Sequence, residues 1–206
     1  LVQASLSPSS VWHRGFEQLL VEGPVLDVRR TPDGRIEVAG LDVASQPASD
    51  GSALDWFFSQ SEFIIRQGTV RWTDELKGQP PLALSQVELA VRNHRRVHAF
   101  RLDASPPPES GERLSVRGRF REPLLELAPR AHGQMPWHDW QGELYAESAR
   151  VDVSQLRAYV DLSRWQVELR AGRGALRAWA DVENGAVRGV LADVSLQDVD
   201  ATLGQG

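Results

Sequence analysis

The stretch Leu114-Ser115-Val116-Arg117-Gly118-Arg119-Phe120-Arg121 alternates apolar or small residues with polar and basic ones along its whole length. Successive side chains of a β-strand point to opposite faces of a sheet, so this alternation predicts a strand with one apolar face and one charged face. The stretch therefore indicates a fold built from amphipathic strands.

The same alternation recurs on both sides of this stretch. In each further predicted strand, one face collects the residues at every second position. These residues are Val87, Leu89 and Val91; His98, Phe100, Leu102 and Ala104; Leu176, Ala178, Ala180 and Val182; and Val190, Ala192, Val194 and Leu196. A period of two that repeats in this way predicts a mainly β chain.

Turn residues indicate where the strands reverse. Asn184-Gly185 lies between the last two predicted strands, and this pair provides the positive φ angles that a tight hairpin turn needs. Pro32-Asp33-Gly34 lies between predicted strands over 25–29 and 35–41. Both segments predict β-hairpins.

Other segments are expected to connect or interrupt the strands. Residues 46–51, 106–111 and 122–136 are rich in Pro, Gly and polar residues and predict loops, and Gly172-x-Gly174 predicts a connection between strands. Two short helices are also expected, each opening at a Ser and carrying an apolar face. Their predicted caps and apolar faces are Ser52 and Asp55 with Leu54, Phe57 and Phe58, and Ser154 with Leu156, Tyr159 and Val160.

These patterns predict a long, curved, mostly antiparallel sheet with two short helices, in a single segment over 1–206 with a sub-boundary near 122–136. The apolar strand faces fit two arrangements. A sandwich would bury them against a second sheet. A single curled sheet would leave them lining a taco-like apolar groove. The alternation alone leaves both open.

The composition restricts the function. The 206 residues carry a formal net charge of -5, which argues against nucleic acid as the main partner. Cys is absent, which excludes disulfides, thiolate catalysis and Cys-based zinc sites. The chain begins at Leu1, and no apolar run approaches the ~18–20 residues that span a bilayer. We therefore expect a segment of a larger protein whose anchor lies outside these residues.

The chain contains an ordered set of short β motifs. In chain order, the main motifs are Gly23-Pro24-Val25-Leu26-Asp27-Val28-Arg29-Arg30, Asp33-Gly34-Arg35-Ile36, Ala39-Gly40-Leu41, Ile64-Ile65-Arg66-Gln67-Gly68-Thr69-Val70-Arg71-Trp72-Thr73-Asp74, Pro81-Leu82-Ala83-Leu84, Val87-Glu88-Leu89, His98-Ala99-Phe100, Gly142-Glu143-Leu144-Tyr145 and Gly174-Ala175-Leu176-Arg177-Ala178-Trp179. This ordered set resembles the YhdP branch of the AsmA-like proteins, the bacterial relatives of bridge-like lipid-transfer proteins. Within it, 64–74 is similar to the family's strand pair that ends in Trp-x-Asp.

The resemblance implies a periplasmic protein anchored in the inner membrane of a Gram-negative bacterium, whose repeated β-groove units carry phospholipid toward the outer membrane. It supplies no catalytic residues, and we expect no enzyme activity. The alternative function is a self-contained β-sandwich that binds carbohydrate or protein and transports no lipid.

If the groove interpretation holds, the apolar strand positions line the groove; otherwise they form ordinary sheet core. The residues expected to line the groove are Val87, Leu89, Val91, Phe100, Leu102, Leu114, Val116, Leu176, Ala178, Val182, Val190, Val194 and Leu196. The expected partners are phospholipid and, through other parts of the parent chain, the membrane. The final strand, near 187–196, is expected to expose an unpaired edge that favours self-association.

No cofactor or metal is expected. His132, His138 and Asp139 lie close together in sequence, but their spacing fits no standard ligand set. The basic clusters over 92–96 and 117–121 are interpreted as a solvated face or as edge protection. Contact with lipid phosphates is the alternative, because Arg binds phosphate bidentately. The Trp residues are expected to pack in the core or at its rim.

Overall fold

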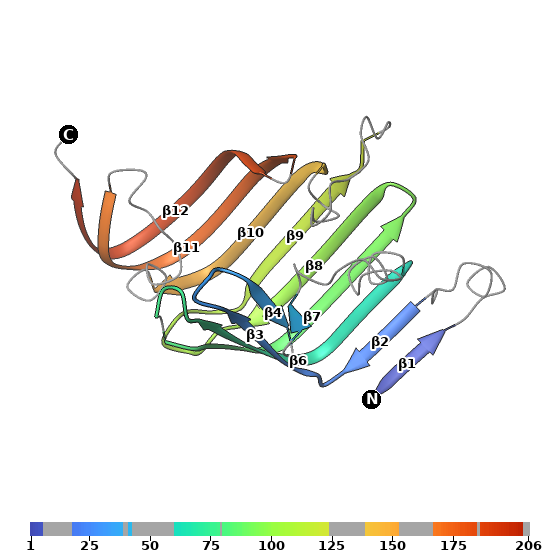
Figure 1. The fold of residues 1–206 in the computed structure, drawn as a ribbon. Coiled ribbons are helices and arrows are strands. Elements are labelled where there is room, and N and C mark those ends of the chain that lie inside the picture. The colour runs from blue at the N-terminus through green and yellow to red at the C-terminus, as the bar shows by residue number, and fades with distance from the viewer. Residues whose placement is uncertain are drawn as a thin grey trace.

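The computed structural model describes residues 1–5, 18–38, 41–42, 60–78, 80–123, 139–152, 167–184 and 186–203. All strands of this part of the chain join a single 12-stranded sheet (Figure 1). The mainly β prediction is thus confirmed. Among the same residues, no helix is long and apolar enough to cross a membrane. Both predicted helices, near 52–58 and 154–160, lie outside the described residues.

The two longest strands, β11 and β12, are the last two in the sequence. Their bounds are β1 Val2–Ser5, β2 Gln18–Glu22, β3 Val25–Arg30, β4 Ile36–Val38, β5 Leu41–Asp42, β6 Glu62–Asp74, β7 Leu82–His94, β8 Val97–Ser105, β9 Leu114–Arg121, β10 Gln141–Asp152, β11 Val167–Glu183 and β12 Ala186–Leu203. From β6 to β12, each strand pairs antiparallel with the next one in the sequence. Of these pairings, the one between β11 and β12 was predicted from its turn residues, Asn184-Gly185.

The N-terminal edge of the sheet is forked. β2 and β3 both pair parallel with β6, β2 along its first half and β3 along its second half. β1 then extends the β2 branch, and β4 and β5 extend the β3 branch. The fork lies at Gly23-Pro24, where Gly23 has a φ of 66° and donates its N–H to the carbonyl of Arg66 at 2.8 Å. The sequence pattern did not indicate these parallel pairs.

The predicted hairpin turns are confirmed, and two other predictions are wrong. Asn184 and Gly34 have φ angles of 51° and 86°, as the turns require. However, 64–74 is part of the single strand β6, which continues through a bulge where Gln67 has a φ of 52°. Gly172 and Gly174 lie inside β11 rather than between strands, and Gly172, with a φ of 153°, marks an irregularity in the pairing with β12.

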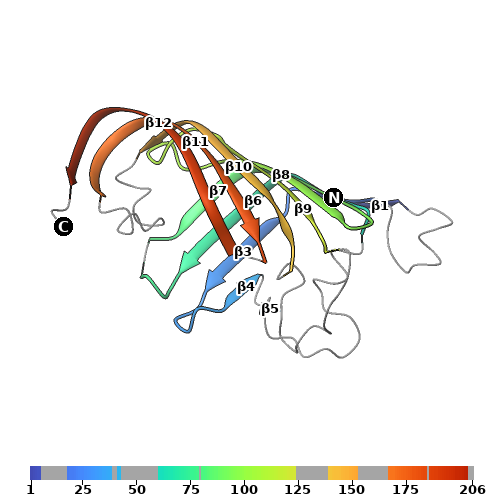
Figure 2. The same cartoon turned by 90° about the horizontal axis from the view of Figure 1, so that it is seen from above.

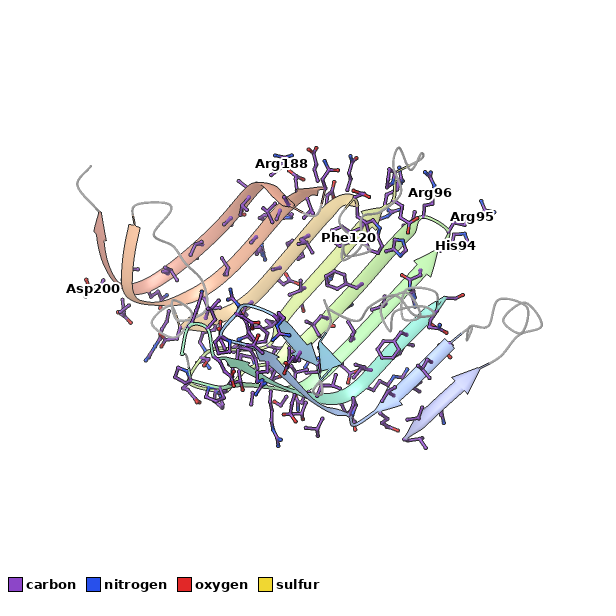
Figure 3. All side chains as sticks on the ribbon, viewed as in Figure 1. His94, Arg95, Arg96, Phe120, Arg188 and Asp200 are labelled. Atoms are coloured by element: carbon purple, nitrogen blue, oxygen red, sulfur yellow. The ribbon has the colours of Figure 1, made fainter. Side chains whose placement is uncertain are left out.

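The sheet is bowed into an arch, and the β11 and β12 ends curl furthest (Figure 2). We call the concave side, on which Figure 3 shows Phe120, the inner face. The register places Phe100 and Leu144 on this side, and it places Arg101 and Tyr145 on the convex side, the outer face. The described strands form one sheet instead of the two stacked sheets of a sandwich.

Candidate functional site

The middle of the inner face is apolar from β6 to β12. Paired residues on adjacent strands point to the same side, so the register defines rows that cross the sheet. Two rows cross its middle: Ile65, Leu89, Leu102, Val116, Ala146, Ala178 and Ala192; and Phe63, Val91, Phe100, Gly118, Leu144, Ala180 and Val190. Neither row contains a polar side chain. The charge-free surface is therefore continuous over seven neighbouring strands, about 28 Å at ~4.7 Å per strand.

Every residue predicted to line a groove lies on this face. Val87 lies opposite Gly68 and two residues from Leu89, and Leu114 lies opposite Ala104. Val182 lies opposite Gly142, and Leu176 pairs with Val194. Figure 3 shows the carbon-only side chains that cover the inside of the arch. The register thus assembles candidates that are far apart in the sequence into one surface.

The two halves of the inner face differ in solvent exposure. On β6 and β7, Ile65 and Val87 are buried, and only 2% of the surface of Val87 is exposed. On β12, Val190 and Val194 are 53% and 54% exposed. The apolar surface therefore ends in a well-packed region on the β6 side and stays open to solvent on the β12 side.

Residues of β3, β6 and β7 line a hollow of about 380 Å³. The sequence analysis did not predict this hollow, because nothing in the local sequence indicated that β3 pairs in parallel with β6. The lining residues are Val28, Arg30, Val70, Trp72, Asp74, Leu82 and Leu84. One guanidinium nitrogen of Arg30 donates to the buried Asp74 carboxylate at 3.4 Å, which closes the hollow at one end with an ion pair.

The outer face carries the charges that the alternation predicted. Arg92 and Glu62 form an ion pair at 2.7 Å, and this contact is the main reason that the pKa of Glu62 lies below its ordinary value. Burial alone would raise the pKa of Asp103, but hydrogen bonds from Arg101 and Ser115 outweigh burial and hold it below the ordinary value. These ion pairs and hydrogen bonds make the outer face polar and distinguish it from the inner face.

An exposed apolar patch, formed by Trp179, Tyr145 and Leu191, interrupts the polar surface of the outer face. Trp179 packs against Tyr145 with ring centroids 5.3 Å apart, and Trp179 remains 37% exposed. Leu191, which pairs with Trp179 across β11 and β12, is 66% exposed. Among the described Trp residues, Trp140 fits the expectation of core packing with 4% exposed, whereas Trp179 does not.

Aromatic rings line one end of the inner face. Phe100 and Phe120 stack in parallel with centroids 6.3 Å apart, and Phe120 contacts Trp140 at 6.2 Å. Their rings close over Gly118, where an added Cβ would lie 2.4 Å from Phe100. Phe120 was the last apolar residue of the stretch that predicted the fold, yet it was not among the predicted lining residues. Because Phe120 alternates with Leu114 and Val116 on the same strand face, the sequence could have predicted its position on the inner face.

This aromatic group ends at a polar rim formed by the β7–β8 turn, the end of β9 and the start of β10. His98 stacks on Trp140 at 3.9 Å. Its ring nitrogens contact Asn93 Oδ1 and Glu122 Oε1, each at 2.9 Å. Asn93 Nδ2 in turn donates to the Gln60 carbonyl at 2.8 Å. We call this end of the sheet the Arg95 rim, after the residue at the tip of the turn.

Within the described ranges, no group of three or more His, Asp and Glu side chains is placed to hold a metal ion. His132 and His138 lie outside those ranges. The arrangement is a surface rather than a cluster of reactive groups. It can bury long apolar chains and leave polar ends at a rim.

The family model described as YhdP protein matches residues 2–206. The chain belongs to the YhdP family. The match covers nearly the whole chain and confirms the relationship that the ordered β motifs indicated. No curated protein and no solved structure matches the chain. The family and the open apolar sheet are therefore the two findings that bear on the function of this chain.

Proposed function

We propose that this YhdP-family segment carries phospholipid along the inner face of its sheet, as part of a periplasmic protein that bridges the inner and outer membranes. The continuous apolar inner face, open to solvent on β12, is the observation that supports the proposal. A soluble domain that merely needed a core would cover such a surface, because large exposed apolar patches are costly in water. Together, the family and this surface favour lipid transport over a self-contained binding domain.

The energetics are sufficient for such a role. Burial of a methylene group contributes about 0.8 kcal/mol, so an acyl chain of about 16 carbons gains on the order of 12 kcal/mol on a fully apolar surface. This gain roughly offsets extraction of the chain from a bilayer. The absence of polar side chains in the central rows means that a chain can slide across strands without returning to water.

We predict that the protein purified under mild conditions carries bound phospholipid, because the exposed Val190 and Val194 surface is more stable when an acyl chain covers it. Organic extraction followed by mass spectrometry measures the bound lipid. A cysteine-free soluble domain of similar size, taken through the same purification, is the control. Lipid at the level of this control would contradict the proposal.

The long edge of β12 leads to a further prediction. β12 spans 18 residues and pairs only with β11 in the described sheet, so its outer edge has unpaired N–H and C=O groups. Charged side chains that could deter pairing are sparse between 187 and 196, namely Arg188 and Asp193. We expect dimers or larger species whose population rises with concentration in light scattering. A strict monomer at high concentration would show that this edge is protected.

A further inference from the structure

We infer that the Arg95 rim binds the phosphate of a phospholipid whose acyl chains lie on the inner face. This inference rests on the proposed function and adds the place and chemistry of headgroup recognition. Arg95 and Arg96 form the β7–β8 turn, whereas Arg121 at the end of β9 pairs with Val97 and therefore lies on the outer face with Arg101. His94, Arg95 and Arg96 project from the end of the sheet beyond Phe120 (Figure 3).

No described carboxylate forms an ion pair with the arginines at the tip of this turn. In the described part of the chain, the nearby carboxylates are already engaged: Glu62 pairs with Arg92 at 2.7 Å, and Glu122 contacts His98 at 2.9 Å. Arg95 and Arg96 form no salt bridge to any described residue. Arg101 and Arg117 on the outer face do have carboxylate partners, at 2.7 and 3.7 Å. Two unpaired cations at the tip of one turn are complementary to an anionic ligand.

One of these cations also has an unsatisfied donor. Nη1 of Arg96 is buried and has no hydrogen-bond partner. A buried donor without an acceptor is costly, and most buried polar groups in folded proteins are paired. A guanidinium matches phosphate oxygens in a bidentate geometry. A phosphate at the tip of the turn would supply the acceptor that Arg96 lacks.

The position of the rim relative to the apolar surface identifies the phosphate as part of a lipid. Phe120 and Trp140 lie directly inside the rim, and aromatic rings beside cations are typical of the boundary between acyl chains and headgroups. From Phe120 to Leu114, β9 presents apolar or glycine positions to the inner face over about 20 Å. One leaflet of a bilayer has an acyl layer of about 15 Å, half of its ~30 Å core. The distance fits a lipid that lies along the strands with its phosphate at the rim.

The test uses two amphiphiles that share their acyl chains. Dihexanoylphosphatidylglycerol, as monomer, carries the phosphate, and dihexanoylglycerol lacks it. Isothermal titration with the full chain compares the variant Arg95→Gln/Arg96→Gln with the control Arg66→Gln/Arg177→Gln. None of these four Arg side chains forms a salt bridge to a described residue, so the two variants lose equal charge.

We expect the rim variant to bind the phosphatidylglycerol about 10- to 30-fold more weakly, because each lost Arg should weaken the attraction to phosphate by roughly three- to fivefold. Binding of dihexanoylglycerol should be unchanged. The control should bind both amphiphiles like the unmodified protein. Unchanged binding of the phosphatidylglycerol by the rim variant, or equal losses in both variants, would overturn the inference. Competition by millimolar inorganic phosphate as strong as by the lipid would also overturn it, because the rim would then be a free-phosphate site. Failure of the unmodified protein to bind either amphiphile would contradict the proposed function itself.

Discussion

Val194→Asp should weaken phospholipid binding at least about 30-fold while leaving the sheet folded. Val194 lies on the inner face of β12 with 54% of its surface exposed, so the new carboxylate stays hydrated in the free protein. A bound acyl chain would cover this carboxylate and lose contact with several methylenes, at a combined cost of about 2 kcal/mol or more. The bound fraction can be measured by titration with a short-chain phosphatidylglycerol.

Leu191→Asp is the matched control. Leu191 is on the same strand, 66% exposed, but on the outer face. The change has the same chemistry and should leave lipid binding within about twofold, since it costs little at an exposed position. Equal loss of binding in both variants would show that the lipid does not distinguish the faces. The inner face would then not be the binding surface.

Val87→Asp should destabilise the fold by about 4 kcal/mol, whereas Val190→Asp should cost less than about 1 kcal/mol. Both residues lie on the inner face, but Val87 is 2% exposed and Val190 is 53% exposed. A carboxylate at Val87 would be buried without a cation, and the apolar contacts of the valine would be lost as well. Thermal unfolding followed by circular dichroism should therefore show a fall in Tm of about 10 °C for Val87→Asp alone.

The comparison separates an open surface from a closed core. In a sandwich, both positions would be buried against a second sheet and both variants would unfold to a similar extent. A large loss of stability in Val190→Asp would mean that the β12 half of the inner face is covered. In that case the open surface on which lipid transport depends would not exist in solution.

The strands and their faces could be predicted from local sequence because the alternation is strong wherever neighbouring strands follow one another in the chain. Leu89, Phe100 and Val116 were assigned to one face from the alternation, and the register places them there. The prediction failed where the structure depends on long-range pairing. Nothing near β3 indicates that Val28 lies beside Trp72 in a parallel pair, so the hollow between β3, β6 and β7 was not foreseen.

Bulges are a second limit of local reasoning. The family resemblance predicted a strand pair over 64–74, and the glycines Gly172 and Gly174 predicted a connection, but the sheet has one continuous strand with a bulge or irregularity at each place. A bulge inserts a residue without ending the ladder, so the period shifts by one residue although pairing continues.

The role of the basic residues near the rim was also left open by the sequence. The basic cluster over 92–96 divides in space into Arg92, which is paired with Glu62, and Arg95 and Arg96, which form no salt bridge in the described sheet.

Site-specific photo-crosslinking would test the central claim most directly, that phospholipid lies on the inner face. A photoreactive phenylalanine analogue replaces Phe100 on the inner face or Tyr145 on the outer face; both are aromatic residues in the middle of the sheet. The protein is illuminated with phospholipid present, and the adducts are identified by mass spectrometry. Lipid adducts at position 100, with few or none at position 145, are the predicted result. Equal adduct yields at both positions, or adducts only at position 145, would contradict the account.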